Sequence, residues 1–378
     1  MCLTFVREFS FLHWVEPAAG GLVMFIALLD LFLTVLYARA GAGFISDHVA
    51  RCTWSLFDWI SKAFGRCRAV VLSLSGSFIV VSLVAGWALM LAVGAGLIMH
   101  PYLGTSVRSS GGSNSTDFLT ALYAGGSSMS LVGSSNYSGE TPVFRMVYLV
   151  NSMIGMSVMS LALTYIMQIY NALQNRNAFG LSVQLMSRGT GDAAVLIQAL
   201  GPDGQFSAGY NNLSSIAEAM VSIREAHEFY PVLFYFRFPE PRYSASRITF
   251  IALDAVSLIR AAIPDGKNGW IKHTASVDQL WEASVSLLKT LEHTLLPGQS
   301  REYPGEPSDA DRESWRRRYY RAIKMLREAG IETVASEQQG ADAYIAMRTC
   351  WNRYVVDLAS YMSWPISDID TTLSRSHA

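Results

Sequence analysis

The sequence predicts an all-α membrane protein with a separate, more polar C-terminal half. Its composition is 51% hydrophobic and only 16% charged, with a mean hydropathy of +0.25. This is too apolar for an ordinary soluble chain of 378 residues. Residues 69–107 and 146–175 contain no Asp, Glu, Lys or Arg. Each stretch exceeds the roughly 20 residues needed to cross the hydrocarbon core of a bilayer, so both are predicted to span a membrane.

A third apolar stretch, residues 17–38, is interrupted only by Asp30. An ionisable side chain is costly inside lipid, so Asp30 is interpreted as a functional position with a buried partner, such as a hydroxyl or an Arg of another helix. The alternative is that this stretch lies partly in the membrane interface. The first 20 residues lack the features of a signal peptide, and we expect the first span to be retained.

The distribution of basic residues predicts the orientation, because cytoplasmic flanks collect Lys and Arg. Five basic residues separate the first two spans, and two follow the last one: Arg39, Arg51, Lys62, Arg66 and Arg68, then Arg176 and Arg188. We therefore expect a multi-pass protein of a bacterial-type plasma (inner) membrane, with its N-terminus outside. The predicted domains are 1–68 (first span and basic linker), 69–175 (two spans and the segment between them) and 176–378 (cytoplasmic).

The segment between the second and third spans has the pattern of an ion pore. After an outer helix over residues 69–100, the sequence predicts a short uncharged helix over 117–129, a Gly/Ser loop over 130–136 and an inner helix over 143–175. Non-helical backbone at membrane depth is tolerated only where it lines a cavity or is buried in protein. A polar loop between two charge-free helices is therefore expected to line a pore.

This segment resembles the pore-loop potassium-channel superfamily, in particular its prokaryotic-like two-transmembrane members. These run Phe-x-x-Ala-Leu-Tyr, then Thr-Val-Gly-Tyr-Gly-Asp, then an inner helix with a central glycine. The matching positions, without a gap, are Phe118, Ala121, Leu122, Tyr123, Val132, Gly133 and Gly155. The resemblance implies a homotetramer in which four loops form a filter, and backbone carbonyls replace the hydration shell of a monovalent cation such as K⁺ or Na⁺.

The filter departs from the family pattern in its outer half. Leu131 replaces the threonine that supplies a side-chain ligand, although Ser130 could replace part of it, while Val132 and Gly133 match. The tyrosine, second glycine and aspartate are replaced by Ser134, Ser135 and Asn136. Because selectivity depends on the number and field of the carbonyl ligands, we expect weak discrimination between potassium and sodium.

Three further positions near this loop have a functional and a structural interpretation. Gly155 falls where the inner helix of the family bends during gating, but a small residue there also permits close helix packing. Asp117 and Glu140 are candidates for a ring of charge at the outer mouth, where Arg145 could pair with either. The alternatives are a helix N-terminal charge for Asp117 and a solvated rim for Glu140. The methionines of the inner helix are interpreted as cavity lining and packing.

The C-terminal half is predicted to be helical and resembles no family that we recognise. Capping-box patterns occur at Ser215 with Glu218 and at Ser276 with Gln279, each before an apolar helical face. Further helices are expected over 244–263, 309–329 and 334–362. Residues 248–263 are interrupted by Asp254 and Arg260, so they are expected to form a core helix and not a fourth span. The apolar runs of a nucleotide-binding parallel sheet are absent from the sequence.

No catalytic or metal-binding motif is visible in that half, so neither an enzyme nor a metal or organic cofactor is expected. The glycine-containing segments 188–192 and 201–204 read as turns. The four cysteines are too few and too scattered for a disulfide framework. A basic run is interpreted mainly as a solvated or intersubunit face, with anionic lipid or a soluble anion as the alternative partner: Arg316, Arg317, Arg318, Arg321 and Lys324.

Three functions remain open from the sequence. The first is a homotetrameric cation channel whose helical domain assembles the tetramer and transmits a signal to the inner helix near residues 170–175. The second is a non-conducting, channel-like membrane sensor or scaffold protein. The third is a membrane-anchored enzyme. Membrane lipids and further copies of the chain are the expected partners, nucleic acid is not, and a cytoplasmic ligand or protein partner cannot be named.

Overall fold

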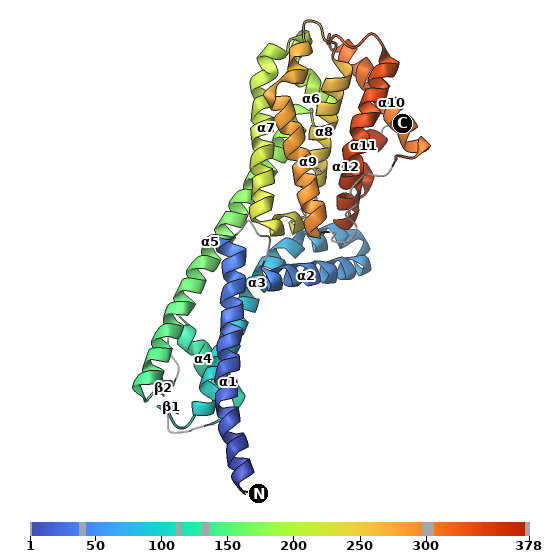
Figure 1. Cartoon of the computed structure of the whole chain (residues 1–378). Coiled ribbons are helices and arrows are strands. Elements are labelled where there is room, and N and C mark those ends of the chain that lie inside the picture. Colours follow the sequence, from blue (N-terminus) through green and yellow to red (C-terminus); the bar gives the residue numbers. More distant parts are fainter. Residues whose placement is uncertain (1, 38–42, 111–114, 131–135, 296–305, 375–378) are drawn as a thin grey trace. The chain divides into compact units, whose positions relative to one another are not determined.

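The computed structural model describes residues 2–37, 43–110, 115–130, 136–295 and 306–374 (Figure 1). It is mostly helical and divides into two compact units. The first unit comprises Met1–Thr53 and Ser77–Ile169, and the second comprises Trp54–Gly76 and Tyr170–Ala378. Helices α2, α3 and α5 each contribute to both units.

Three helices are long and apolar enough to cross a membrane, as the sequence predicted. The candidate spans are Trp14–Leu36, Arg68–Tyr102 and Pro142–Met186. The first is formed by α1 (Cys2–Leu31) and a π-helical turn (Phe32–Leu36), and the others by α3 (Arg68–Met99) and α5 (Pro142–Met186). A helix of 45 residues is about 68 Å long, which is twice the thickness of the hydrocarbon core. The helix expected over 143–175 therefore continues well beyond a bilayer.

A short helix, α4 (Phe118–Met129), lies between α3 and α5 in the sequence, where the sequence predicted it. Two three-residue strands flank it, β1 (Val107–Ser109) and β2 (Tyr137–Gly139). They pair antiparallel, with Val107 opposite Gly139 and Ser109 opposite Tyr137. This ribbon was not predicted, and it closes the ends of the segment that contains α4 and the expected filter. Met99, Ala121, Ala124 and Phe144 form part of the small core behind it.

The second unit is a helical domain built around α8 (Ala245–Ala262), in which every residue except Arg260 is buried. The expected core helix over 248–263 is thereby confirmed. Around α8 lie seven further helices, α6 (Ala193–Leu200), α7 (Phe206–Phe229), α9 (Ala275–Leu295), α10 (Asp309–Glu328), α11 (Glu337–Tyr361), α12 (Ile366–Ile369) and α13 (Thr371–Ser374). The helix α2 (Phe44–Ala63) joins this unit through its C-terminal half.

Both predicted capping boxes are wrong. Ser215 lies in the middle of α7, which begins nine residues earlier at Phe206. Ser276 lies within the first turn of α9, where its hydroxyl is 3.3 Å from the hydroxyl of Tyr210. Residues three apart share a face anywhere along a helix, so the spacing of a capping box also occurs inside one. The glycine-containing segments are turns as predicted, with Arg188 and Asp203 both at positive φ.

The interpretation of the basic run as a solvated face is wrong for Arg318, which is only 3% exposed. Its guanidinium lies 2.7 Å from a carboxylate oxygen of Asp192 and 2.8 Å from one of Asp254. Burial alone would lower the pKa of Arg318, but the charges of Asp254 and Asp192 outweigh burial and raise it. Arg348 forms a second buried pair with Asp370, at 2.6 Å. These groups tie α6, α8, α10 and α11 together in the centre of the domain.

Candidate functional site

Helix α4 begins at a side-chain cap provided by Asp117. The carboxylate of Asp117 accepts hydrogen bonds from the Thr120 backbone N–H, at 3.3 Å, and the Thr120 hydroxyl, at 2.7 Å. Hydrogen bonds from Ser115 and Thr120 lower the pKa of Asp117 to about 2, so this exposed carboxylate is ionised at neutral pH. The structural interpretation of Asp117 as a helix N-terminal charge is confirmed. The outer-mouth role stays a prediction.

Small residues let α4 pack closely against α3. A Cβ added to Gly125 would lie 2.5 Å from the backbone nitrogen of Gly96 and 2.7 Å from the carbonyl carbon of Ala95. A Cβ added to Gly96 would in turn lie 3.1 Å from the Cα of Leu122. A side chain on Gly125 would therefore require the backbone to shift, and one on Gly96 would require Leu122 to give way slightly. The two backbones therefore touch along the middle of α4.

The C-terminal end of α4 packs against α5. A Cβ added to Gly155 would overlap the carbonyl oxygen of Met129, the last residue of α4. One turn earlier, the side-chain amide of Asn151 donates a buried hydrogen bond of 3.0 Å to the hydroxyl of Ser128. Helix α5 continues through Gly155 without interruption. The glycine is thus required by a close approach, and its predicted role as a gating hinge stays a prediction.

Five of the seven expected filter residues, Leu131, Val132, Gly133, Ser134 and Ser135, lie outside the described residues. The two at the ends of the loop are described. Ser130 follows α4 in an extended conformation, and the backbone carbonyl of Asn136 accepts a 2.7 Å hydrogen bond from Ser110 N–H.

Glu140 is exposed beside the ribbon. Within the described residues of the single chain, Arg145 forms no ion pair with Glu140 or Asp117, and its guanidinium donates to the carbonyl of Gly139 at 3.2 Å. The solvated-rim interpretation of Glu140 is consistent with this exposure. A role at an outer mouth stays a prediction.

Helix α5 exposes a row of polar side chains within its candidate span. We call this row the polar stripe; its four exposed members are Ser160, Thr164, Gln168 and Asn171. Spacings of four, four and three residues place them on one face of the helix. Only 11% of the most apolar window of α5 is buried, against 33% and 39% for the other two spans. The Thr164 hydroxyl donates to the Ser160 carbonyl at 3.0 Å.

The polar stripe was not predicted, because residues 146–175 were interpreted only as a charge-free span. The signal was available, since uncharged polar residues recur at helical spacing in that stretch. Two exposed apolar residues of α5, Met159 and Leu163, lie to one side of this row, whereas the exposed Met167 lies within it.

Asp30 is 4% exposed and lies in a cluster that joins α1, α2 and α3. One carboxylate oxygen accepts the backbone N–H of Ile45 at 2.8 Å. The other accepts the Ser46 hydroxyl at 2.6 Å and the Trp87 indole N–H at 2.8 Å. Ser46 is the hydroxyl partner that was expected, and Trp87 was not foreseen. Because each oxygen has at least one donor, the carboxylate is satisfied by protein groups.

In the second unit, the segment 231–236 contacts the ends of two spans. The guanidinium of Arg176 on α5 donates to the carbonyls of Leu233, at 2.7 Å, and Phe236, at 2.8 Å. The Ser75 hydroxyl on α3 donates to the carbonyl of Tyr235, at 3.2 Å. The basic residue that marked the end of the third span in the sequence is thus a buried anchor.

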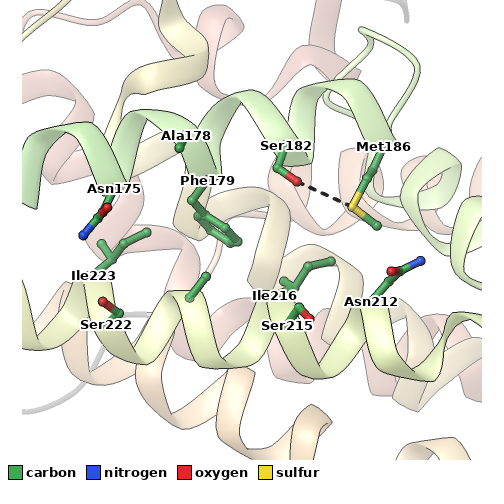
Figure 2. Close-up of a pocket in the computed structure, with 11 residues that line it drawn as sticks. Asn175, Ala178, Phe179, Ser182, Met186, Asn212, Ser215, Ile216, Ser222 and Ile223 are labelled. Atoms are coloured by element: carbon green, nitrogen blue, oxygen red, sulfur yellow. Dashed lines mark hydrogen bonds between the residues drawn. The ribbon is translucent and has the colours of Figure 1, made fainter.

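A groove of about 420 Å³ lies between α5 and α7 (Figure 2). Its lining contains no charged side chain, and Asn175 and Ser182 on α5 face Asn212, Ser215 and Ser222 on α7 across an apolar floor. Asn175 and Ser182 lie on the same face of α5 as the polar stripe.

No family model matches this chain, and neither does any curated protein or any solved structure.

Proposed function

We propose that this chain is one subunit of a homotetrameric cation channel in a plasma membrane, with its N-terminus outside and residues 176–378 in the cytoplasm. The observation that carries the proposal is the polar stripe of α5. Four uncharged polar side chains are exposed in a helix that is long and apolar enough to cross a membrane.

Amide and hydroxyl groups are costly to expose to lipid, because hydrocarbon offers them no hydrogen-bond partners. The Thr164 hydroxyl has a backbone partner, but the amides of Gln168 and Asn171 carry more donors and acceptors than one helix can satisfy. A water-filled cavity removes this cost. Four copies of α5 with their stripes turned toward a common axis would enclose such a cavity.

The packing of α4 places its C-terminal end beside Gly155 of α5, on the side of Met159 and not on that of the polar stripe. Its last residue, Met129, contacts Gly155, and Gly155 precedes the first stripe residue, Ser160, by five positions. At 1.5 Å per residue, the C-terminal end of α4 lies about 8 Å along α5 from the start of the stripe. Helix C-termini carry partial negative charge, so this end would stabilise a cation close to the loop that follows it. The loop 130–136 follows immediately and is the proposed filter.

In this proposal the permeant ions are monovalent and the filter discriminates weakly between K⁺ and Na⁺. The basis is the substituted outer half of the loop, where Ser134 and Ser135 stand in place of an aromatic residue and a glycine. Opening is controlled by the second unit through segment 231–236. Because Arg176 is buried and bonded to two carbonyls of this segment, a rearrangement of the helical domain would pull on α5 where it leaves the membrane.

The test is cysteine modification during single-channel recording in planar bilayers. In a background with all four native cysteines changed to Ser, Thr164→Cys introduces a thiol on the polar stripe. Leu163→Cys is the matched control, because Leu163 is also exposed in the single chain but lies about 100° around the helix from Thr164, outside the polar stripe. We expect a water-soluble cationic thiol reagent to reduce the current of Thr164→Cys and to leave that of Leu163→Cys unchanged.

Equal effects of the reagent on both variants would contradict the proposed pore lining. Absence of current from well-folded tetramers would favour the non-conducting sensor or scaffold instead.

A further inference from the structure

The helix α2 (Phe44–Ala63) has two different long sides. One side is buried and carries Ser46, Ala50, Trp54 and Ser61. The other side, which we call the outer side of α2, carries Cys52, Leu56, Trp59 and Ala63, all exposed. The spacings on the outer side are four, three and four residues, so these four side chains form one row. Trp59 is 71% exposed, which is unusual for so large an apolar side chain.

Exposed apolar side chains of the second unit gather in this region. Among its described residues, eleven large hydrophobic side chains are exposed, and five of them lie within residues 56–74: Leu56, Trp59, Phe64, Val70 and Leu74. An apolar surface of this density indicates a partner. Val70 and Leu74 belong to α3 and lie inside the candidate span Arg68–Tyr102.

Chain connectivity indicates what that partner is. Seven residues separate the span ending at Leu36 from Phe44, and four separate Ala63 from Arg68. At 3.3–3.6 Å per residue, these connections reach only about 25 Å and 15 Å. The bonds of Asp30 to Ile45 and Ser46 further fix the start of α2 to the end of α1. Both ends of α2 are therefore held near the same face of the membrane.

The charges of α2 do not favour electrostatic docking. Arg51 pairs with Asp47 at 2.6 Å, and Lys62 pairs with Asp58 at 2.9 Å. Arg68 also approaches Asp58, at 3.5 Å. Cations neutralised within the helix attract anionic lipid weakly. Aromatic side chains such as Trp59 and Phe64, by contrast, favour the level of the lipid headgroups.

We propose that α2 is an interfacial membrane helix, whose outer side inserts into the headgroup region of the bilayer that α1 and α3 cross. The occupant of this apolar surface is lipid, held by apolar and aromatic insertion and not by lipid charge. The proposal rests on the membrane spans and is independent of ion conduction.

The buried side of α2 links this lipid contact to the helical domain. The ring of Trp54 lies 5.8 Å from that of Tyr235, within segment 231–236, and 6.3 Å from that of Tyr361. Asp58 accepts a 2.9 Å hydrogen bond from the Ser363 hydroxyl. Helix α2 therefore contacts, through Tyr235, the same segment 231–236 that binds Arg176. A change in how deeply α2 lies in the interface would act on that segment.

The test uses the native thiol of Cys52, which lies on the outer side of α2. Full-length protein with Cys2, Cys67 and Cys350 changed to Ser is labelled at Cys52 with an environment-sensitive fluorophore and reconstituted into zwitterionic phosphatidylcholine vesicles. Lipids carrying a nitroxide quencher near the headgroup or deep in the acyl chain then report the depth of the label. The matched control retains only Cys350, an exposed thiol on α11 of the helical domain.

We expect the Cys52 label to be quenched more by the shallow nitroxide than by the deep one, and the Cys350 label by neither. Addition of anionic lipid should not increase the quenching, and Trp59→Ala should reduce it. Quenching at Cys52 no greater than at Cys350 would overturn the proposal, and intersubunit cross-linking at Cys52 would then identify a second copy as the occupant. Quenching that requires anionic lipid would overturn the apolar mode of binding.

Discussion

Replacing Asp30 by Asn tests whether the buried carboxylate holds α1, α2 and α3 together. The substitution keeps the size of the side chain and removes its charge. In the structure the two carboxylate oxygens accept from a backbone N–H of α2, the Ser46 hydroxyl and the indole N–H of Trp87. An amide offers one acceptor oxygen and turns an NH₂ group toward the remaining donors.

The expected cost follows from these contacts. The Ser46 hydroxyl can rotate to accept, but one N–H, from the Trp87 indole or from Ile45, loses its acceptor, at a cost of about 1–3 kcal/mol. The surviving bonds also lose the extra strength that a charged acceptor provides, about 1 kcal/mol each. The sum is about 3–5 kcal/mol, which corresponds to a fall in Tm of roughly 4–6 °C for a chain of 378 residues.

The assay is thermal unfolding of the purified protein in detergent, followed by intrinsic fluorescence. Asp47→Asn is the matched control, because Asp47 lies one residue beyond Ser46 but forms only a partly exposed pair with Arg51. Loss of such a pair costs at most about 1 kcal/mol. A Tm of Asp30→Asn equal to that of Asp47→Asn would refute the argument that the carboxylate stabilises this junction.

Three further variants test the packing of α4 and the core of the helical domain. Gly155→Ala should destabilise by about 1–3 kcal/mol because its Cβ meets the Met129 carbonyl, whereas Gly86→Ala, with open space around it, should not; equal Tm shifts would contradict this. Burial and the charge of Arg176 lower the pKa of His227 to about 3, so only the unfolded state gains a proton between pH 6.5 and about 3. Unfolding free energy should therefore fall by about 1.4 kcal/mol per pH unit below pH 6.5, with no such dependence above it, and His227→Gln should lose this contribution in urea titrations. Asp254→Asn should cost about 3–5 kcal/mol in the same titrations because Arg318 stays buried with one partner fewer, and a cost as small as that of the exposed Asp278→Asn would contradict the network.

The three spans were predictable because a bilayer tolerates few alternatives. In hydrocarbon, the backbone N–H and C=O groups of the charge-free stretches 69–107 and 146–175 can all be paired if these stretches form helices. The structure has α3 and α5 there. Helix α4 was predictable for a local reason, since Asp117 provides an N-cap before an uncharged run. Helix α2 was not predicted, because its charged residues were interpreted only as an indication of orientation. The signal for a helix was present in the apolar residues at helical spacing, Cys52, Leu56, Trp59 and Ala63.

Long-range contacts could not be predicted from local patterns. Arg318 stands in a run of arginines, and nothing adjacent to it in the sequence indicates that Asp192 and Asp254 bury it. Strands β1 and β2 have three residues each and pair across about thirty positions. Strands this short give no recognisable pattern in the sequence, and nothing local indicates so distant a partner. For Asp30, only the chemical type of partner could be predicted. A buried carboxylate requires a hydrogen-bond donor, but the sequence does not specify which helix supplies it.

The measurement that tests the central claim most directly is single-channel recording of the purified protein in planar bilayers under potassium/sodium bi-ionic conditions. The account predicts cation currents with a reversal potential near zero, abolished by Gly133→Asp in the expected filter and reduced by thiol modification of Thr164→Cys. Currents that persist in Gly133→Asp, or no current from folded tetramers across varied lipid, pH and calcium, would contradict it.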